Sequence, residues 1–405
     1  MRQPVLGSTT SALNSAVTRW IHPMAGTTAA WFSNDVCANR FYIYQPFKLV
    51  NFVVDIDTAA GVGITRTFTM QIVGVDTAMV ATITGAAQIQ ATFVGVISGT
   101  AGQYITIKQV ISGGTATAAG SFRFSSMLET PNNILTMGFS NGNGASNSAR
   151  TWCFPMGQYN LAWLGTEGTG DRMYLPGAYT LKSIYALVNA ATGAGKKWTF
   201  SFYQNAADVA ATRFDLGGAG VTSANIQNLS VAGVATDHFE FSALPTGTPT
   251  SFSQITITTE WVPAVAGESI MSAAPITVSG SATTFFQTIH PGIVGSTAAE
   301  TTMRYILPPN TEFFCKDYRV VCTAPGAGGS GKTRTFTLRK NSGAGNNSIL
   351  VSETATTGTD LTHQDKFVGL DYISNQCAVA STPASAAVNY YNTVWMPPNP
   401  IISSS

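Results

Sequence analysis

The residues with the most suggestive chemistry form a glycine-rich stretch, 326–333, which matches the phosphate-binding pattern G-x-x-x-x-G-K-[ST] and ends at Lys332-Thr333. In nucleotide-binding loops this pattern places backbone N–H groups and the lysine around the phosphates, and the N-terminus of a following helix adds positive potential. Here the next residues alternate as a strand does, with Phe336 and Leu338 on one face. The corresponding loops at 61–64 and 193–196 lack the motif. We therefore interpret the stretch as a hairpin loop and predict no nucleotide or other cofactor.

Histidines and aspartates are the next candidates, as metal ligands. None of the four histidines has a neighbour at a spacing suited to zinc, and we predict that none is a ligand. They are His22, His238, His290 and His363. The aspartates on strands and polar loops lack the dense alternation of oxygen ligands that a calcium loop needs, so we predict solvated turn acids and leave one weak Ca²⁺ site open. They are Asp55, Asp57, Asp360, Asp365 and Asp371.

Nucleophiles give no clearer signal. The cysteines are odd in number and no pair has metal-ligand spacing, which favours scattered buried thiols over a disulfide framework. They are Cys37, Cys153, Cys315, Cys322 and Cys377. Serine and threonine are too abundant for any Ser–His–Asp group to stand out. We therefore predict that the chain is not an enzyme and has no catalytic, cofactor-binding or metal-binding residues.

The overall charge excludes further classes of partner. Charged residues make up 10% of the 405 residues and the net charge is +1, whereas about 25% charged residues is usual. No electrostatic footprint for nucleic acid or an acidic membrane is present. The start lacks the apolar core of a secretion signal, and no run approaches the roughly 18 apolar residues of a membrane span. We expect a protein that is made soluble in a cytoplasm.

The elements that would have to position any site are strands, and the sequence of one strand occurs in three versions along the chain. The alternating stretch Thr335-Phe336-Thr337-Leu338 has a close relative around Phe68 and a looser one around Phe200. These phenylalanines are 132 and then 136 positions apart. Each lies at the centre of an alternating strand, so we predict that all three are buried in equivalent strands.

Other landmarks keep nearly the same spacing. Trp20 and Trp152 open matching Trp-Pro phrases, which we interpret as packed connectors at the entrance of each unit. Arg40, Arg172 and Arg304 are evenly spaced along the chain, and each precedes a short apolar run and a turn. No long stretch shows a helical period with caps.

About eight short strands in roughly 130 residues, with turns every 8–12, is typical of a β-sandwich or jelly roll. We predict an all-β chain of three tandem jelly-roll-like β-sandwich domains that arose from internal repeats. The expected divisions are an N-terminal arm at 1–19 and sandwiches at 20–145, 146–282 and 283–405.

The Arg/Lys-Thr-Phe-Thr strand, its glycine-rich approach and the turn Thr357-Gly358-Thr359-Asp360 resemble the jelly-roll repeats of tailed-bacteriophage virion proteins, of the head-decoration and fibre type. The third unit carries the resemblance best. It implies a virion component with a binding role and no catalysis, and it transfers no functional residue.

Two functions remain open. The first is a non-enzymatic structural protein of the virion, a capsid decoration or surface protein that binds copies of itself, as a homotrimer, and other virion proteins. The second is a receptor- or carbohydrate-binding fibre or baseplate module, which would use exposed aromatics against a host surface glycan. Candidates for that role are Tyr159, Trp163 and Tyr203, although a core position is the simpler interpretation of each. Fold alone cannot choose between the two functions.

Overall fold

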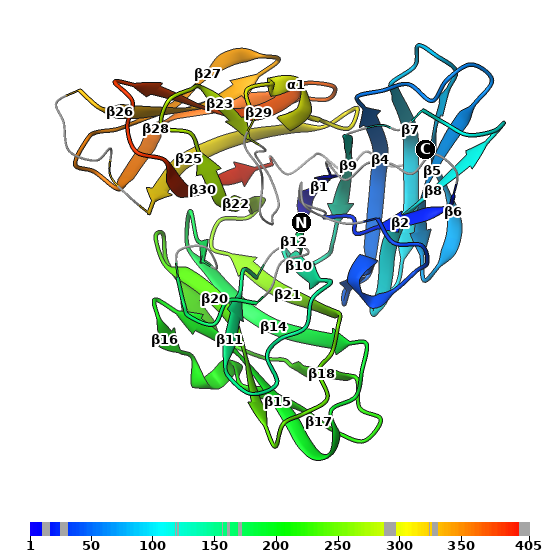
Figure 1. Cartoon of the computed structure of the whole chain (residues 1–405), viewed down its shortest axis with the longest axis vertical. Coiled ribbons are helices and arrows are strands. Elements are labelled where there is room, and N and C mark those ends of the chain that lie inside the picture. The colour runs from blue at the N-terminus through cyan, green and yellow to red at the C-terminus, as the bar shows by residue number, and fades with distance from the viewer. Residues whose placement is uncertain are drawn as a thin grey trace.

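A computed structural model of the chain contains three β-sandwiches in tandem (Figure 1). It describes residues 1–9, 17–24, 31–117, 119, 121–155, 157–159, 163–168, 172–286, 297–323, 325 and 331–396. Each sandwich consists of two sheets that pack face to face over an apolar core, and the pairing is antiparallel except between β10 and the short edge strand β12. Among the described residues, no helix is both long and apolar enough to cross a membrane.

The first sandwich has a sheet of strand order β1-β9-β4-β7 and a sheet of order β2-β8-β5-β6, with β3 added beside β8. Its elements are β1 Arg2–Thr9, β2 Arg19–Ile21, the short 3₁₀ helix Cys37–Asn39, β3 Phe41–Ile43, β4 Phe47–Ile56, β5 Thr65–Ile72, β6 Val75–Thr84, β7 Gln90–Gly99, β8 Gln103–Ser112 and β9 Phe122–Glu129.

The second sandwich has sheets of order β10-β21-β14-β18 and β11-β20-β15-β17, with short strands added at their edges. Its elements are β10 Leu135–Asn141, β11 Thr151–Cys153, β12 Gly157–Tyr159, β13 Met173–Tyr174, β14 Tyr179–Val188, β15 Gly193–Gln204, β16 Ala207–Asp208, the 3₁₀ helix Ala210–Thr212, β17 Phe214–Gly218, β18 Ser223–Ile226, β19 Val231–Gly233, β20 His238–Thr246 and β21 Ile255–Pro263.

The third sandwich has sheets of order β22-β30-β25-β28 and β23-β29-β26-β27, with β24 added beside β29. Its elements are β22 Glu268–Val278, β23 Thr284–Phe286, α1 Glu300–Met303, β24 Tyr305–Ile306, β25 Glu312–Cys322, β26 Thr333–Lys340, β27 Gly343–Val351, β28 Thr357–Val368, β29 Tyr372–Ala380 and β30 Ala386–Trp395.

The same strand order recurs in all three. If the eight main strands of a sandwich are numbered along the chain, one sheet has the order 1-8-3-6 and the other 2-7-4-5. This is the strand order of a jelly roll, in which the strands pair 1 with 8, 2 with 7, 3 with 6 and 4 with 5 across two Greek keys. The predicted fold class, three tandem jelly-roll sandwiches, is confirmed.

The core of each sandwich forms where the sequence places it. Phe68, Phe200 and Phe336 lie on β5, β15 and β26, the fourth main strand of their sandwiches, and all three are fully buried. Because side chains alternate along a strand, Thr67, Thr199 and Thr335 on the same strands face outward and are partly exposed.

The loops before these strands turn on glycine. Gly61 and Gly193 occupy matching positions at φ +112° and +93°, a backbone region that other residues rarely adopt. In the third sandwich most of the residues that match the phosphate-binding pattern, 326–330, lie outside the described residues. A strand, β26, begins at Thr333 in place of the helix that a nucleotide-binding loop requires.

The predicted divisions of the chain need correction at three places. The segment predicted as an N-terminal arm includes β1, which pairs with β9 along its whole length and is the first strand of the first sandwich. Likewise β10 pairs with β21, and β22 with β30, so residues assigned to the ends of the first and second repeats are the first strands of the second and third sandwiches. These first strands begin at equal intervals along the chain, but they share no recognisable letters.

The Trp-Pro phrases are also strands and not connectors. Trp20 lies in β2 and Trp152 in β11, the second strands of their sandwiches, and the backbone of each tryptophan bridges to the chain a dozen residues later. In the third sandwich Phe285 of β23 makes the same bridge.

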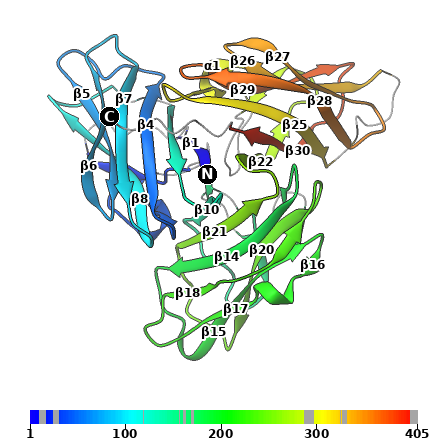
Figure 2. The same cartoon turned by 180° about the vertical axis from the view of Figure 1, so that it is seen from behind.

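The three sandwiches surround a common centre, where the N-terminus also lies (Figures 1 and 2). In both views the sheets of order 1-8-3-6 face this centre, and we call them the inner sheets; the sheets of order 2-7-4-5 face outward and are called the outer sheets. First strands meet across the centre, where the side chain of Gln3 on β1 exchanges two hydrogen bonds with the backbone of Thr136 on β10.

Candidate functional site: the junctions between sandwiches

The most extensive candidate surfaces are the places where one sandwich docks on the next. In each sandwich the chain that leads into and out of the short strand β3, β13 or β24 projects toward a neighbour, and we call it the docking segment. β3 contacts β10 and β21 of the second sandwich, β13 contacts β22 and β30 of the third, and β24 contacts β4 and β9 of the first. The contacts therefore run head to tail around a closed ring. We name them the first, second and third junctions.

At the first junction, hydroxyl groups of the second sandwich bind backbone carbonyls of the first. Thr258 on β21 donates to the carbonyl of Tyr42 over 2.9 Å, Thr256 donates to that of Cys37, and Ser140 on β10 donates to that of Ala38. All three hydroxyl-bearing residues are buried, and each bond gives a buried hydroxyl a partner in the neighbouring sandwich.

Aromatic and glycine contacts reinforce the first junction. The rings of Tyr44 and Tyr185 stack with centroids 3.5 Å apart and planes 5° from parallel. Gln45 donates to Glu260 over 3.0 Å. Phe41 lies against Gly138 on β10, where an added Cβ would come within 2.6 Å of the ring, so the close approach requires glycine at this position.

The third junction repeats the first with different side chains. Ser125 on β9 donates to the carbonyl of Ile306 on β24, and Arg123 donates to the carbonyl of Thr301. Ser125 and Arg123 occupy the positions on β9 that Thr258 and Thr256 occupy on β21. The accepting carbonyls also correspond: Ile306 lies as far along the chain from Tyr42 as Thr301 lies from Cys37. Donors at the same strand positions therefore bind carbonyls at the same docking-segment positions in both junctions, although the two sequences share no motif there.

The third junction also has its own contacts. Leu6 and Met127 of the first sandwich share one apolar cluster with Tyr305 and Leu307 of the third. Beside this cluster, Asp55 pairs with Arg123 over 2.7 Å, and both side chains are at most 4% exposed. Burial raises the pKa of Asp55, and the positive charges of Arg123 and Arg304 oppose that rise.

At the second junction the residue equivalent to Thr258 also contacts the docking segment, but through an aromatic ring and not a hydroxyl group. Tyr391 on β30, at the position that Thr258 holds on β21, stacks on Tyr174 of β13 with ring centroids 5.2 Å apart and an interplanar angle of 13°. Ile270 on β22 belongs to the same apolar cluster as the core of the second sandwich. At all three junctions the docking segment therefore contacts the inner sheet of the next sandwich, and the side chains that contact it differ from one junction to the next.

A cluster that resembles a metal site was missed by the sequence analysis. The side-chain ligand atoms of Glu167, His238 and Glu240 all lie within 4.8 Å of one another. Arg172 lies among them, with its Nε 2.7 Å from Glu240 and an Nη 3.2 Å from Glu167. Burial is the first cause that lowers the pKa of His238, to about 4, and the charge of Arg172 adds to it. Glu167 and His238 lie far apart in the sequence, so only the fold brings them together.

The equivalents of this cluster explain what it does. Arg40 pairs with Asp35 over 2.9 Å and lies 4.5 Å above the ring of Tyr104, and Arg304 lies 3.8 Å above the ring of Tyr372. Each arginine thus fixes the start of its docking segment to strand seven of the same sandwich. In the second sandwich the guanidinium already supplies the positive charge that a metal ion would bring to the two carboxylates.

The other candidates from the sequence lie in structural positions. Asp365 and Asp360 are buried acceptors on β28, and not the solvated turn acids that we predicted. Asp365 accepts from the backbone amides of Asn346 and Asn347, and Asp360 from that of Ser348. Asp371 and Asp55 are buried too, so the same prediction fails for them, while Asp57 is exposed. Carboxylates whose oxygens already accept N–H donors have fewer lone pairs for a cation, which argues against the weak Ca²⁺ site that the sequence left open.

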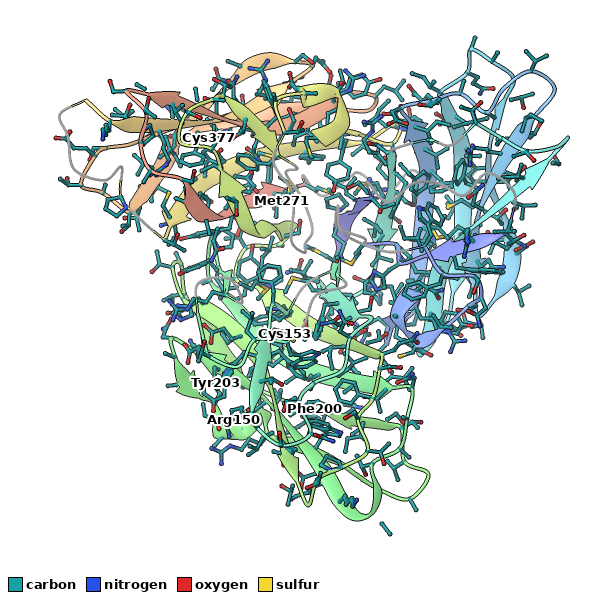
Figure 3. All side chains as sticks on the ribbon, in the orientation of Figure 1. Arg150, Cys153, Phe200, Tyr203, Met271 and Cys377 are labelled. Carbon is teal, nitrogen blue, oxygen red and sulfur yellow. The ribbon has the colours of Figure 1, made fainter. Side chains whose placement is uncertain are left out.

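The histidines and cysteines are scattered through the fold. His22 is buried and its Nδ1 accepts from the amide of Met24, His363 pairs with Asp360 over 3.0 Å, and His290 lies outside the described residues. All five cysteines are free and buried, as predicted. Figure 3 shows two of them, Cys153 and Cys377, in different sandwiches.

The aromatic residues considered for glycan binding are mostly core residues. Trp163 is 7% exposed and donates to the carbonyl of Asn143, and Tyr203 is 8% exposed. Arg150 lies 5.4 Å from the ring of Tyr203 (Figure 3). The backbone of Tyr159 lies in β12, and its side chain is outside the described part of the structure.

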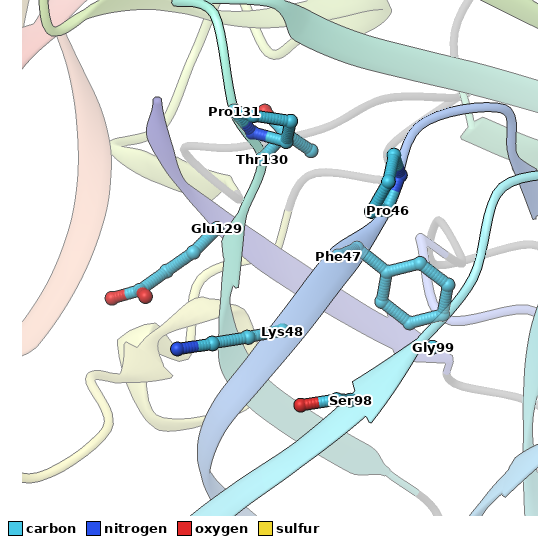
Figure 4. A pocket seen from close by; sticks show the side chains of 8 residues that line it. All are labelled: Pro46, Phe47, Lys48, Ser98, Gly99, Glu129, Thr130 and Pro131. Carbon is cyan, nitrogen blue, oxygen red and sulfur yellow. The ribbon is translucent and has the colours of Figure 1, made fainter.

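Two hollows lie at the rim of the third junction. One, of about 410 Å³, opens between the ends of β4, β7 and β9, where Phe47 covers Gly99 and Lys48 lies near Glu129 (Figure 4). The other, of about 500 Å³, lies between the inner sheet of the first sandwich and Asn310–Glu312 of the third. Glu129 at their shared rim is paired with Arg2 over 2.5 Å. The first hollow is lined by the first sandwich alone, and only the second is shared with the third sandwich.

Comparison with known proteins adds little. No protein-family model and no curated protein matches the chain. Among solved structures it is similar to a chain of Sulfolobus turreted icosahedral virus, at 11% identity, 98% and 97% coverage of the two chains and a TM-score of 0.19. A second match is to a structure described by the triple jelly roll fold and turret assembly of an archaeal virus, at 12% identity, 95% and 90% coverage and a TM-score of 0.18.

A third match is to infectious bursal disease virus, strain Gx, at 7% identity, 98% and 81% coverage and a TM-score of 0.18. At TM-scores of this size the likeness carries no argument about this chain. Its fold follows from its own strand order.

Proposed function

We propose that the chain is a non-enzymatic structural protein of a virion, a building block of the shell surface such as the decoration protein of a tailed bacteriophage head. The observation that carries this proposal is the closed ring of three jelly rolls, in which each docking segment contacts the inner sheet of the next sandwich and equivalent hydrogen bonds recur at the first and third junctions. A head-to-tail contact that closes after three steps gives a compact block with approximate threefold symmetry.

Such a block suits a shell because one polypeptide supplies what would otherwise take three copies of a single jelly roll. The inner sheets are covered by docking segments of the same chain, so the outer sheets and the loops remain for neighbours. The sequence analysis predicted a homotrimer. That homotrimer of the whole chain stays a prediction, and we propose that each chain assembles with copies of itself and with other virion proteins.

Several residues that could have carried chemistry have structural partners. Arg172, Asp360 and Asp365 hold loops or strands in place, and β26 follows the phosphate-loop spelling without a helix. These assignments support a non-enzymatic role without a cofactor or metal. The alternative, a receptor- or carbohydrate-binding fibre or baseplate module, has less support because Trp163 and Tyr203 are buried.

Labelled virions test the proposal. A short peptide tag fits the loop at Val62, whose side chain is 86% exposed between Gly61 and Gly63. We expect gold-labelled antibody against the tag to decorate the particle head at regular spacing in negative-stain images. Label confined to a tail or fibre tip would favour the receptor-binding alternative, and purified particles without label would overturn the proposal.

A further inference from the structure

The third junction differs from the other two in one respect, which is that no linker spans it. Five residues join β9 to β10 across the first junction, and four join β21 to β22 across the second. Five residues reach at most about 18 Å when fully extended, so these junctions can only hinge. The third sandwich, by contrast, can swing away from the first while both linkers stay intact.

The surfaces that meet at the third junction are not specific to one chain. Ser125 and Arg123 bind backbone carbonyls, and every docking segment presents carbonyls whatever its sequence. A head-to-tail contact of this kind closes within one molecule or continues into the next, and exchange of an identical element between copies keeps every contact. We propose that the third junction also forms between two chains, so that the inner sheet of the first sandwich is a binding surface for the docking segment of a second copy.

Concentration decides which form is present. A flexible tether of few residues gives an effective local concentration in the millimolar range, so the closed single chain predominates in dilute solution. In two exchanged chains the docking segment of each third sandwich binds the first sandwich of the other chain, so the contacts of the third junction are kept. This form becomes accessible where chains are crowded, as on the surface of a particle.

Opposite charges at the third junction allow the exchange to be tested. Asp55 lies on the first sandwich with Arg123 beside it, and Arg304 belongs to the third sandwich and interacts electrostatically with Asp55. In Asp55→Arg the junction within one chain brings three positive charges together. Arg304→Glu replaces the attraction between Arg304 and Asp55 by repulsion between two carboxylates. Neither variant should close its own ring.

Mixing the two variants restores both contacts only between chains. The third sandwich of Arg304→Glu then meets the first sandwich of Asp55→Arg, and the remaining pair is the natural one. We expect each variant alone to run as a chain of 42.5 kDa with an enlarged radius, and the equimolar mixture to give a species of twice that mass by light scattering. The matched control carries both substitutions in one chain and should return to a compact monomer.

A mixture that stays at 42.5 kDa while the double variant closes would overturn the proposal. So would single variants that remain as compact as the wild type, or that dimerise without each other. Circular dichroism of each variant checks that the sandwiches are folded. If either fails to fold, Asp55→Lys and Arg304→Asp repeat the test with shorter side chains and the same expected outcomes.

Discussion

Phe68, Phe200 and Phe336 lie in the middle of the fourth strand of their sandwiches, each packed between two sheets with no exposed surface. Truncating a buried phenylalanine to alanine removes its transfer free energy and leaves a cavity. We expect each Phe→Ala variant to lose on the order of 3–5 kcal/mol of unfolding free energy, measured by chemical denaturation.

The outer face of the same strands supplies the control. Thr67→Ala, one residue before Phe68 and partly exposed, should change the unfolding free energy by no more than about 0.5 kcal/mol. Losses below about 1 kcal/mol for all three phenylalanine variants would contradict the assignment of these strands to the core.

His22 makes the first sandwich sensitive to acid. Burial lowers its pKa from 6.5 to about 3, so the unfolded chain takes up a proton that the folded one refuses. Below about pH 6.5 the stability should therefore fall with decreasing pH, by up to about 1.4 kcal/mol per pH unit from this residue, until its folded pKa is reached. Above pH 6.5 no such dependence is expected.

His22→Asn separates this contribution from others. The Asn side-chain oxygen takes the place of Nδ1 as acceptor for the amide of Met24, but it does not titrate. The variant should lose less stability than the wild type between pH 6.5 and 4, as measured by denaturation at several pH values. Parallel pH profiles of the two proteins would show that His22 is not responsible.

Single residues also show where prediction from sequence stops. The alternation of apolar and polar residues predicts that Phe336 is buried, because it depends only on the neighbouring residues in the sequence. It does not reveal that Asp365 is buried, since its donors, the amides of Asn346 and Asn347, come from a neighbouring strand. Nor does it place Glu167 beside His238 and Glu240, since only the fold joins residues so distant along the chain.

Among the elements, β1 has the largest consequence for the boundaries of the sandwiches. Its eight residues pair with β9, Val5 enters the core of the first sandwich, and Leu6 enters the apolar cluster of the third junction. The sequence does not mark this segment as a strand, because the first strands share no sequence pattern, whereas the fourth strands of the first and third sandwiches are nearly identical and that of the second is a looser version.

Deleting residues 1–9 should therefore unfold the first sandwich, where an arm could be removed without effect on folding. The deletion leaves β9 paired only with β4 and removes Val5 from the core of the first sandwich. We expect the first sandwich to become susceptible to limited proteolysis while fragments from the second and third persist. A truncated chain as resistant as the full one would restore the interpretation as an arm.

At the scale of the whole molecule, the ring could not be read from the sequence, because its recurring bonds end on backbone carbonyls. Ser125 and Thr258 make the same bond at the third and first junctions. Removing either hydroxyl leaves a buried carbonyl without its donor, at a cost of about 1–3 kcal/mol. The two losses should nevertheless have different consequences, because a linker holds the first junction and none holds the third.

We expect Ser125→Ala to raise hydrogen exchange in residues 301–311 by about 5- to 30-fold, because about 1–2 kcal/mol shifts an opening equilibrium by that factor. Thr258→Ala, the matched control, should change exchange in residues 37–45 much less, since the short linker between β9 and β10 returns the two sandwiches to contact. Equal increases at both segments would show that the first and third junctions open alike, and that the missing linker gives the third no preference for opening. A larger increase at the first junction would place the weak point there and remove the basis for exchange between chains.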